Sequence, residues 1–377
     1  MKGKQGMVCM GLLLVLSSCH TGKQITASGL QRKDFQTEVN GQHTDLFTLS
    51  NKQGMEVCIT NYGARVVSIL VPDRNGKRED VVCGFSTITE YMEQRQNFGS
   101  TVGRYIGRIL NARFTLDGVE YKLVPNNGKS GHISHGGNPG FADRIWKVEQ
   151  ADTHRVCLSY LSPDGENGFP GNLKVTLVYS LGEDDNALDL TYEATTDAPT
   201  VLNLSHHSFF NISGNFTKSV EDQQLWVDAD RFTPYDDKKC VTGEYLPVAG
   251  TPLDFRMPHA IGECIDADHP QLKVVNGYDH TWELNTKGDD TRPAAWVYDP
   301  ASGRKMEIFT TEPGMQIYTG NGLKGKMTGK GGIAYPFRSA VCFETMHFQD
   351  SPNHPGFPST VLRPGEVFRS HTVYKFE

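Results

Sequence analysis

The sequence of 377 residues lacks the features that most readily identify a nucleic-acid-binding, metal-binding or membrane-spanning protein. Its formal net charge is −7, and it has no basic run beyond the first few residues, which argues against nucleic-acid binding. No cysteines after residue 19 have the close spacing of a zinc knuckle or a redox dithiol, and no histidines have the spacing typical of a metal site. No repeat of about 20–50 residues is present. We therefore predict a large globular domain with free, buried cysteines, no metal and no nucleic-acid partner.

The first 19 residues have the pattern of an export signal. Lys2 and Lys4 precede the apolar run MVCMGLLLVL, which is too short for a membrane-spanning helix and is followed by SSC, ending at Cys19. This ending resembles the lipobox of bacterial lipoproteins, whose cysteine is lipidated and becomes the first mature residue; an ordinary secretory signal is the alternative. We expect a signal peptide at 1–18, a polar tether at 19–34, and an exported lipoprotein held at the membrane through Cys19, in the periplasm or on the outer membrane.

The rest of the chain reads mostly as β-strands. Apolar and polar residues alternate over 173–181 and 187–196, the pattern of half-buried strands, with the polar loop GEDDN between them. Asp117-Gly118 and Asn75-Gly76 predict hairpin turns, and HTVYKFE predicts a closing strand. Only 86–94 suggests a helix. We predict an all-β fold, one large antiparallel β-sandwich over 35–377.

Several carboxylates, histidines and arginines lie in apolar or glycine-rich stretches. Glu344 follows Val341, Cys342 and Phe343, and an unpaired buried carboxylate is so costly that it needs a partner or a function that uses its perturbed pKa. The other candidates are Arg104, Arg108, His132, His135, Asp254 and Asp279. Each also has a structural interpretation: Arg104 could form an ion pair, His132 could be a loop histidine, and His280 could be satisfied by the backbone.

Two adjacent histidines, His206 and His207, interrupt the strand-like stretch NLSHHSFFNISG. Neighbouring side chains of a strand point to opposite faces, so only one of the two can face a given site.

Taken together, these stretches resemble the aldose 1-epimerase (galactose mutarotase) family over nearly the whole chain after the export signal. The resemblance rests on many motifs in the family's order: TNYGARVVSILVPDRNG, GRYIGRI, HGGNPGFADRIW, DGENGFPGNLKVTLVY, YEATTDAPTVLNLSHHSFFNISG, GTPLDFR, NGYDHTWEL, EPGMQIYTGN and CFETMHFQDSPNHPGFPSTVLRPGE. It implies the galactose mutarotase-like supersandwich, a small-molecule sugar substrate and no cofactor.

The resemblance also implies a set of site residues. Glu344 and His207 match the catalytic base and acid. The matching substrate-binding residues are Arg108, His135, Asp279 and Gln316. The sequence departs from the family at four positions in or next to these motifs: Gly107 and His206 stand where Asn is common, Ser134 where Leu is usual, and Met346 where Gln often follows Glu-Thr.

The implied reaction interconverts the α and β anomers of a free aldohexose such as glucose or galactose by acid–base ring opening. Tyr278 and Trp282 are expected to offer apolar faces to the sugar. One alternative is a glycoside hydrolase of similar architecture, which would use two carboxylates and leave the histidines without a role. The other is a non-catalytic sugar-binding lipoprotein, which would not need the Glu–His pair.

Overall fold

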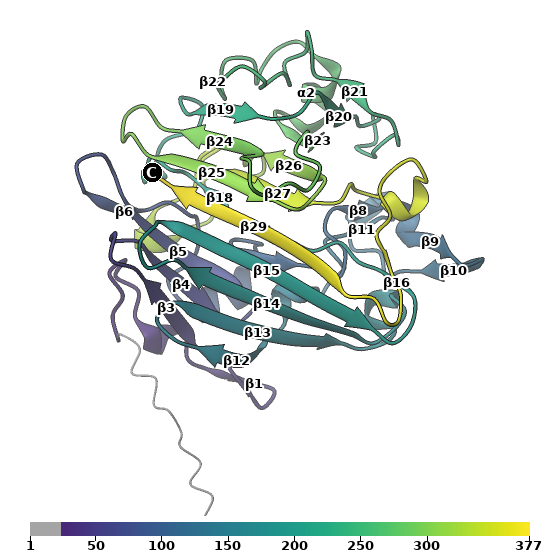
Figure 1. Cartoon of the computed structure of the whole chain (residues 1–377), viewed down its shortest axis with the longest axis horizontal. Helices are drawn as coiled ribbons and strands as arrows, with labels where there is room; N and C mark the ends of the chain where they lie inside the picture. Colours follow the sequence, from purple (N-terminus) through teal and green to yellow (C-terminus); the bar gives the residue numbers. More distant parts are fainter. Residues whose placement is uncertain (1–23) are drawn as a thin grey trace, which may run out of the picture.

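The computed structural model describes residues 24–377, so the predicted signal peptide and Cys19 lie outside the described residues. The largest element is a nine-stranded antiparallel sheet that crosses the whole molecule (Figure 1). In spatial order its strands are β12 (Lys147–Ala151), β13 (Arg155–Ser162), β14 (Leu173–Leu181), β15 (Ala187–Thr196), β29 (Phe368–Phe376), β25 (Lys305–Thr310), β24 (Ala295–Tyr298), β19 (Gln224–Val227) and β22 (His259–Ala260).

Two further sheets complete the sandwich. A six-stranded sheet contains β18 (Phe209–Phe210), β27 (Val341–Met346), β26 (Gly314–Tyr318), β23 (Asp279–Glu283), β20 (Arg231–Thr233) and β21 (Leu246–Pro247). A four-stranded sheet contains β3 (Leu46–Ser50), β4 (Glu56–Thr60), β5 (Arg65–Pro72) and β6 (Arg78–Asp80). Their apolar side chains join those of the nine-stranded sheet in one large core, which confirms the predicted all-β sandwich.

Five two-stranded pairs and two short α-helices of the described residues lie outside these three sheets. The pairs are β1 (Glu38–Val39) with β2 (Gln42–His43), β7 (Ser100–Val102) with β17 (Ser205–His207), β8 (Arg108–Ile109) with β11 (Ile133–Ser134), β9 (Arg113–Leu116) with β10 (Val119–Lys122), and β16 (Thr200–Val201) with β28 (Val361–Leu362). The helices are α1 (Ile88–Gln94) and α2 (Pro270–Val275).

Local sequence signals account for many of these elements. The two alternating runs became β14 and β15 with the predicted bounds, and Asp117-Gly118 forms the turn between β9 and β10, with positive φ at both residues. Thr87 is the N-cap of α1 and forms a capping box. The Thr87 hydroxyl accepts from the Glu90 backbone N–H, and the Glu90 carboxylate accepts from the Thr87 backbone N–H. The helix α2 was missed, because six residues between Pro270 and the left-handed Asn276 are too few for a visible helical period.

The predicted tether is wrong from residue 24 onward. Ile25 pairs with Gln31 in an isolated bridge, and the Ala27 N–H donates to Glu56 Oε1 at 2.6 Å. Leu30 is buried in a second apolar cluster beside the four-stranded sheet. These contacts make 24–34 part of the packed domain. The six cysteines of the described residues are free, as predicted, but only four are buried, and Cys157 and Cys264 are partly exposed.

On the nine-stranded sheet, His371 of β29 bridges two carboxylates, with Nε2 3.1 Å from Asp189 and Nδ1 2.7 Å from Asp290. Both ring nitrogens must donate, so the charged form is favoured and the pKa of His371 rises to about 9. A raised pKa adds stability that is fully present below the unfolded value of about 6.5 and is lost as the pH rises through about 9.

We therefore expect His371→Gln to lower the free energy of unfolding by about 1–2 kcal/mol at pH 6, allowing for partial solvent exposure, and by much less at pH 9.5. Urea unfolding at both pH values measures this difference. His43→Gln, at an exposed histidine of β2, is the control and should have little effect at either pH. Equal losses at pH 6 and pH 9.5 would show that His371 stabilises the sheet by packing alone.

Candidate active site

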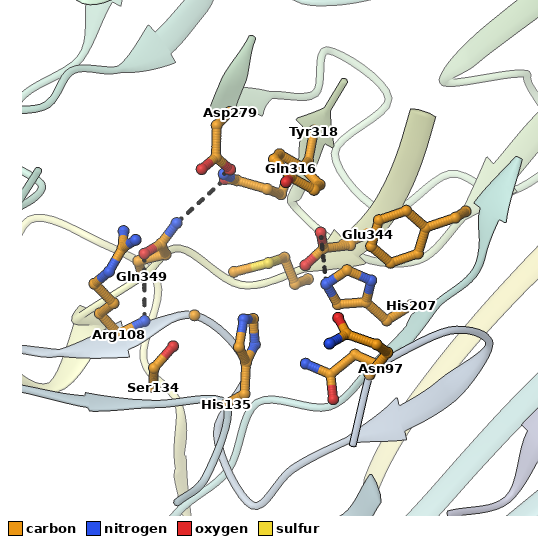
Figure 2. Close-up of a pocket in the computed structure, with 14 residues that line it drawn as sticks. Asn97, Arg108, Ser134, His135, His207, Asp279, Gln316, Tyr318, Glu344 and Gln349 are labelled. Carbon is orange, nitrogen blue, oxygen red and sulfur yellow. Dashed lines mark hydrogen bonds and ion pairs between the residues drawn. The ribbon is translucent and has the colours of Figure 1, made fainter. Parts of the chain in front are cut away.

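A cavity of about 240 Å³ opens on the face of the six-stranded sheet that points away from the core (Figure 2). This volume is slightly below the roughly 300–1,000 Å³ of sites for drug-sized ligands, so it suits a smaller molecule. Its walls are mostly polar. They consist of Gln96, Asn97, Gly107, Arg108, Ser134, His135, His207, Phe209, Asp279, Gln316, Tyr318, Glu344, Met346 and Gln349. All six residues that the family resemblance implied are among them.

Strand alternation explains how the six-stranded sheet supplies three of these six residues, Asp279, Gln316 and Glu344. Both faces of β27 are buried: Val341 and Phe343 join the main core, while Glu344 and Met346 point into the cavity. On β26 the same alternation turns Gln316 and Tyr318 to the cavity, and on β23 it does so for Asp279. Cross-strand pairing then places Gln316 beside Glu344 and Tyr318 beside Asp279.

The same alternation corrects one expectation. Tyr278 and Trp282 lie at odd distances from Asp279, so both side chains enter the main core, where neither is exposed. The Tyr278 hydroxyl donates to the Pro252 carbonyl, and the Trp282 indole N–H donates to the Leu253 carbonyl. The apolar surface of the cavity comes instead from Phe209, Tyr318 and Met346.

His207 and Glu344 lie next to each other in the cavity wall. His207 Nε2 lies 3.4 Å from Glu344 Oε1, and their side chains are only 7% and 5% exposed. Burial, together with the charge of Asp279, raises the pKa of Glu344 well above its usual value. Burial also lowers the pKa of His207 well below its usual value. These shifts make the Glu344 carboxylate a stronger base and the His207 imidazolium a stronger acid.

His206 lies on the opposite face of β17, as strand geometry requires. Its Nε2 is 2.6 Å from Ser208 Oγ, and its ring packs edge-on against Tyr179 in the core. Burial lowers the pKa of His206 to about 3, so it is a neutral core histidine. Only His207 of the pair lines the cavity.

His135 lies beside His207, with ring centroids 5.5 Å apart. Its backbone has a positive φ of 52°, and Gly136 after it has φ 77°, where a Cβ would lie 2.0 Å from the Gly103 carbonyl oxygen. The glycine therefore lets this turn approach the chain before β8. Burial and the charge of Arg108 lower the pKa of His135 to about 4, so the ring is neutral at physiological pH.

The far end of the cavity carries Arg108, Asp279 and Gln316. Gln316 Nε2 donates to Asp279 Oδ1 at 2.6 Å, which holds the carboxylate in place. Burial raises the pKa of Asp279, although the nearby Arg108 opposes this shift. A cation, a carboxylate and an amide at one end can bind several hydroxyl groups at once.

Other polar candidates have structural roles outside the cavity. Arg104 is buried and donates to Ser162 Oγ and to the carbonyls of Pro170 and Gly171. His132 accepts from the Asn111 N–H. Asp254 forms an ion pair with Arg256 at 2.8 Å. All three have structural roles and do not line the cavity, although Arg104 is held by neutral acceptors and not by the expected ion pair.

One group in the described residues could hold a metal ion: the ligand atoms of His207, Cys342 and Glu344 lie within 4.8 Å of one another. Sequence spacing did not reveal it, because His207 is far from the other two in the chain. A metal would need the Cys342 thiolate, and burial raises the pKa of this thiol well above its usual value. That no metal takes part stays a prediction.

The aldose 1-epimerase family model matches residues 45–375. The chain belongs to the aldose 1-epimerase family. It is similar to galactose mutarotase from Bos taurus (40% identical, covering 88% of this chain and 93% of that protein) and to aldose 1-epimerase from Escherichia coli strain K12 (36% identical, covering 89% and 96%). Among solved structures, it resembles an aldose epimerase homologue from C. elegans with a TM-score of 0.81 and 31% identity, covering 89% of this chain and 99% of the other.

The solved galactose 1-epimerase from Lactobacillus acidophilus is also similar, with a TM-score of 0.79 and 28% identity, covering 90% of this chain and 96% of the other. Membership of the aldose 1-epimerase family makes the protein an isomerase with the mutarotase fold. The glycoside hydrolase and the non-catalytic binding protein lack this support.

Proposed function

We propose that this aldose 1-epimerase interconverts the α and β anomers of free glucose and galactose, with Glu344 as the base and His207 as the acid. The observation that carries the assignment is the buried pair itself, 3.4 Å apart at one side of a polar cavity. A hydrolase that uses two carboxylates would leave His207 without a function, whereas anomer exchange needs one base and one acid.

The reaction begins when Glu344 removes the proton from the O1 hydroxyl of the sugar. The electron pair of the O1–H bond forms the carbonyl at C1, the bond between C1 and the ring oxygen breaks, and His207 protonates that oxygen. Rotation about the C1–C2 bond then presents the other face of the aldehyde. Ring closure returns both protons, so no electrons leave the sugar and no cofactor is consumed.

The remaining residues bind the sugar. His135, neutral and next to His207, is placed to donate or accept at the ring oxygen or a neighbouring hydroxyl. Arg108, Asp279 and Gln316 bind hydroxyls at the other end of the cavity. Buried polar groups of this kind discriminate strongly, because a sugar that lacks the matching hydroxyl leaves them unpaired.

Polarimetry on freshly dissolved α-glucose or α-galactose tests the proposal. The protein should accelerate the change in rotation to the same final value that the spontaneous reaction reaches. An aryl glycoside incubated with the protein should stay intact. Release of the aryl group would support a hydrolase, and binding of sugar without faster mutarotation would support a non-catalytic binding protein.

We also propose that the protein is an exported lipoprotein anchored through Cys19, in the periplasm or on the outer membrane. The support is the sequence pattern of residues 1–19, which lies outside the described residues. Within residues 24–377, no helix is long and apolar enough to cross a membrane.

A fatty-acid probe supplied to bacteria that express the full chain should label the wild-type protein, and the product should partition into detergent. Cys19→Ala should remove the label, while Cys157→Ala, at a partly exposed cysteine, should keep it. Equal labelling of wild type and Cys19→Ala would contradict the anchor.

A further inference from the structure

Gln349 occupies a space in the cavity that a side chain at residue 107 would need. Gly107 has φ +75°, and a Cβ built on it would lie 2.5 Å from Gln349 Cγ and 3.0 Å from Cδ. The present position of Gln349 and any side chain at 107 therefore exclude each other. Residue 107 is also one of the positions at which this sequence departs from the family, since Asn is common there.

The carboxamide of Gln349 is held on both sides. Its Nε2 donates to the Tyr235 hydroxyl at 2.6 Å and faces Gln316 Oε1 at 3.3 Å, and its Oε1 accepts from the Arg108 backbone N–H at 3.3 Å. The backbone N–H can only donate, so it fixes which end of the amide is oxygen. Gln349 is 4% exposed, which leaves its orientation little freedom.

Counting donors and acceptors shows what this amide can still bind. Both N–H groups of Gln349 have partners, while Oε1 has two lone pairs and one protein donor. The unused capacity is therefore one acceptor in the cavity wall. A sugar hydroxyl is a donor that matches it.

We propose that Gln349 is a specificity-determining residue whose Oε1 accepts a hydrogen bond from a sugar hydroxyl remote from C1. This inference rests on the proposed function. Figure 2 shows His207 and Glu344 at one side of the cavity and Gln349 at the other, with Arg108 and Asp279. When C1 lies at the acid–base pair, Gln349 meets the part of the ring where aldohexoses differ in hydroxyl configuration.

Gln349→Ala and Gln349→Met test this role with glucose, galactose and their monodeoxy derivatives. A neutral hydrogen bond contributes roughly 0.5–1.5 kcal/mol, so kcat/KM should fall about two- to twelvefold for the parent sugar. For the one deoxy sugar that lacks the partner hydroxyl, wild type and variants should be equal. Methionine preserves the volume beside Gly107 without the amide, so a Met variant with wild-type selectivity would show that Gln349 only fills space.

Gly107→Asn gives an independent test, because Asn tolerates positive φ better than most residues. Alone, it must displace Gln349, and kcat/KM should fall tenfold or more. In the Gln349→Ala background the same change should cost less than about threefold, because residues in contact behave non-additively. Additive effects would overturn the proposal.

Gln42→Ala, at an exposed glutamine of β2, is the control and should match wild type with every sugar. Thermal midpoints identify variants that lose activity by unfolding. A wild-type protein without mutarotase activity would contradict the proposed function itself. An active wild type whose Gln349 variants keep the same sugar selectivity would contradict this inference alone.

Discussion

Replacing Glu344 by glutamine is expected to lower kcat by roughly 10²–10⁴-fold, about 3–5 kcal/mol in activation free energy, because the amide keeps the shape but cannot accept the O1 proton. Within the described residues, the ion-pair partner of this carboxylate is His207, at 3.4 Å, so the substitution acts on the acid–base pair itself. The rate should be measured by polarimetry and corrected for spontaneous mutarotation.

The pH dependence of the rate should also differ between the wild type and Glu344→Gln. Burial raises the pKa of Glu344 and lowers that of His207, so the pair holds one proton over a wide pH range, and the wild-type rate should fall at acidic pH, where the pair takes up a second proton. Glu344→Gln should lose this acidic limb. Its thermal midpoint should not fall, because the substitution removes a carboxylate whose burial is costly.

Glu312 offers a matched control. It is 2% exposed and lies 2.7 Å from His347 Nδ1, so it is also a buried glutamate paired with a histidine, but it does not line the cavity. Glu312→Gln should lower the thermal midpoint and leave kcat within about threefold of wild type. A Glu344→Gln protein that retained more than a tenth of the wild-type rate would place the base elsewhere.

Strand alternation made much of the fold and part of the site predictable. The alternating runs of β14 and β15 sit in a sheet with one face on the core, so their burial follows the sequence pattern. The strand β27 differs, because both of its faces are buried, one against the core and the other beneath the cavity, so its residues do not alternate between buried and exposed. Within such a strand, a lone carboxylate such as Glu344 stands out.

The other residues of the cavity show which positions strand alternation can predict and which it cannot. Phe209, Tyr318 and Met346 each lie two positions after a predicted site residue, so alternation alone could have found them. Gln349 lies beyond the end of β27, where no period applies, and its place depends on contacts with Arg108 and Tyr235 that are distant in the chain. Tyr278 and Trp282 were assigned by residue type, and alternation from Asp279 would have excluded them.

Replacing His207 by asparagine is expected to lower the activity, whereas replacing His206 by asparagine is expected to lower the thermal stability. His207→Asn should lower kcat by roughly 10²-fold or more, because the ring oxygen no longer receives a proton efficiently. Its thermal midpoint should change little, since the side chain borders the cavity. His206→Asn should keep most of the activity but lower the thermal midpoint, because it removes a ring packed against Tyr179 in the core.

The pH profile distinguishes the two histidines further. The wild-type rate should fall at high pH, where the acid–base pair has lost its proton, and His206→Asn should keep this alkaline limb. His207→Asn should lose it, because the group that supplies the proton is gone. Since β17 is a strand, a shift of one residue in its register would exchange the two side chains between core and cavity. An active His207→Asn protein together with a folded but inactive His206→Asn protein would therefore show that His206, and not His207, faces the sugar.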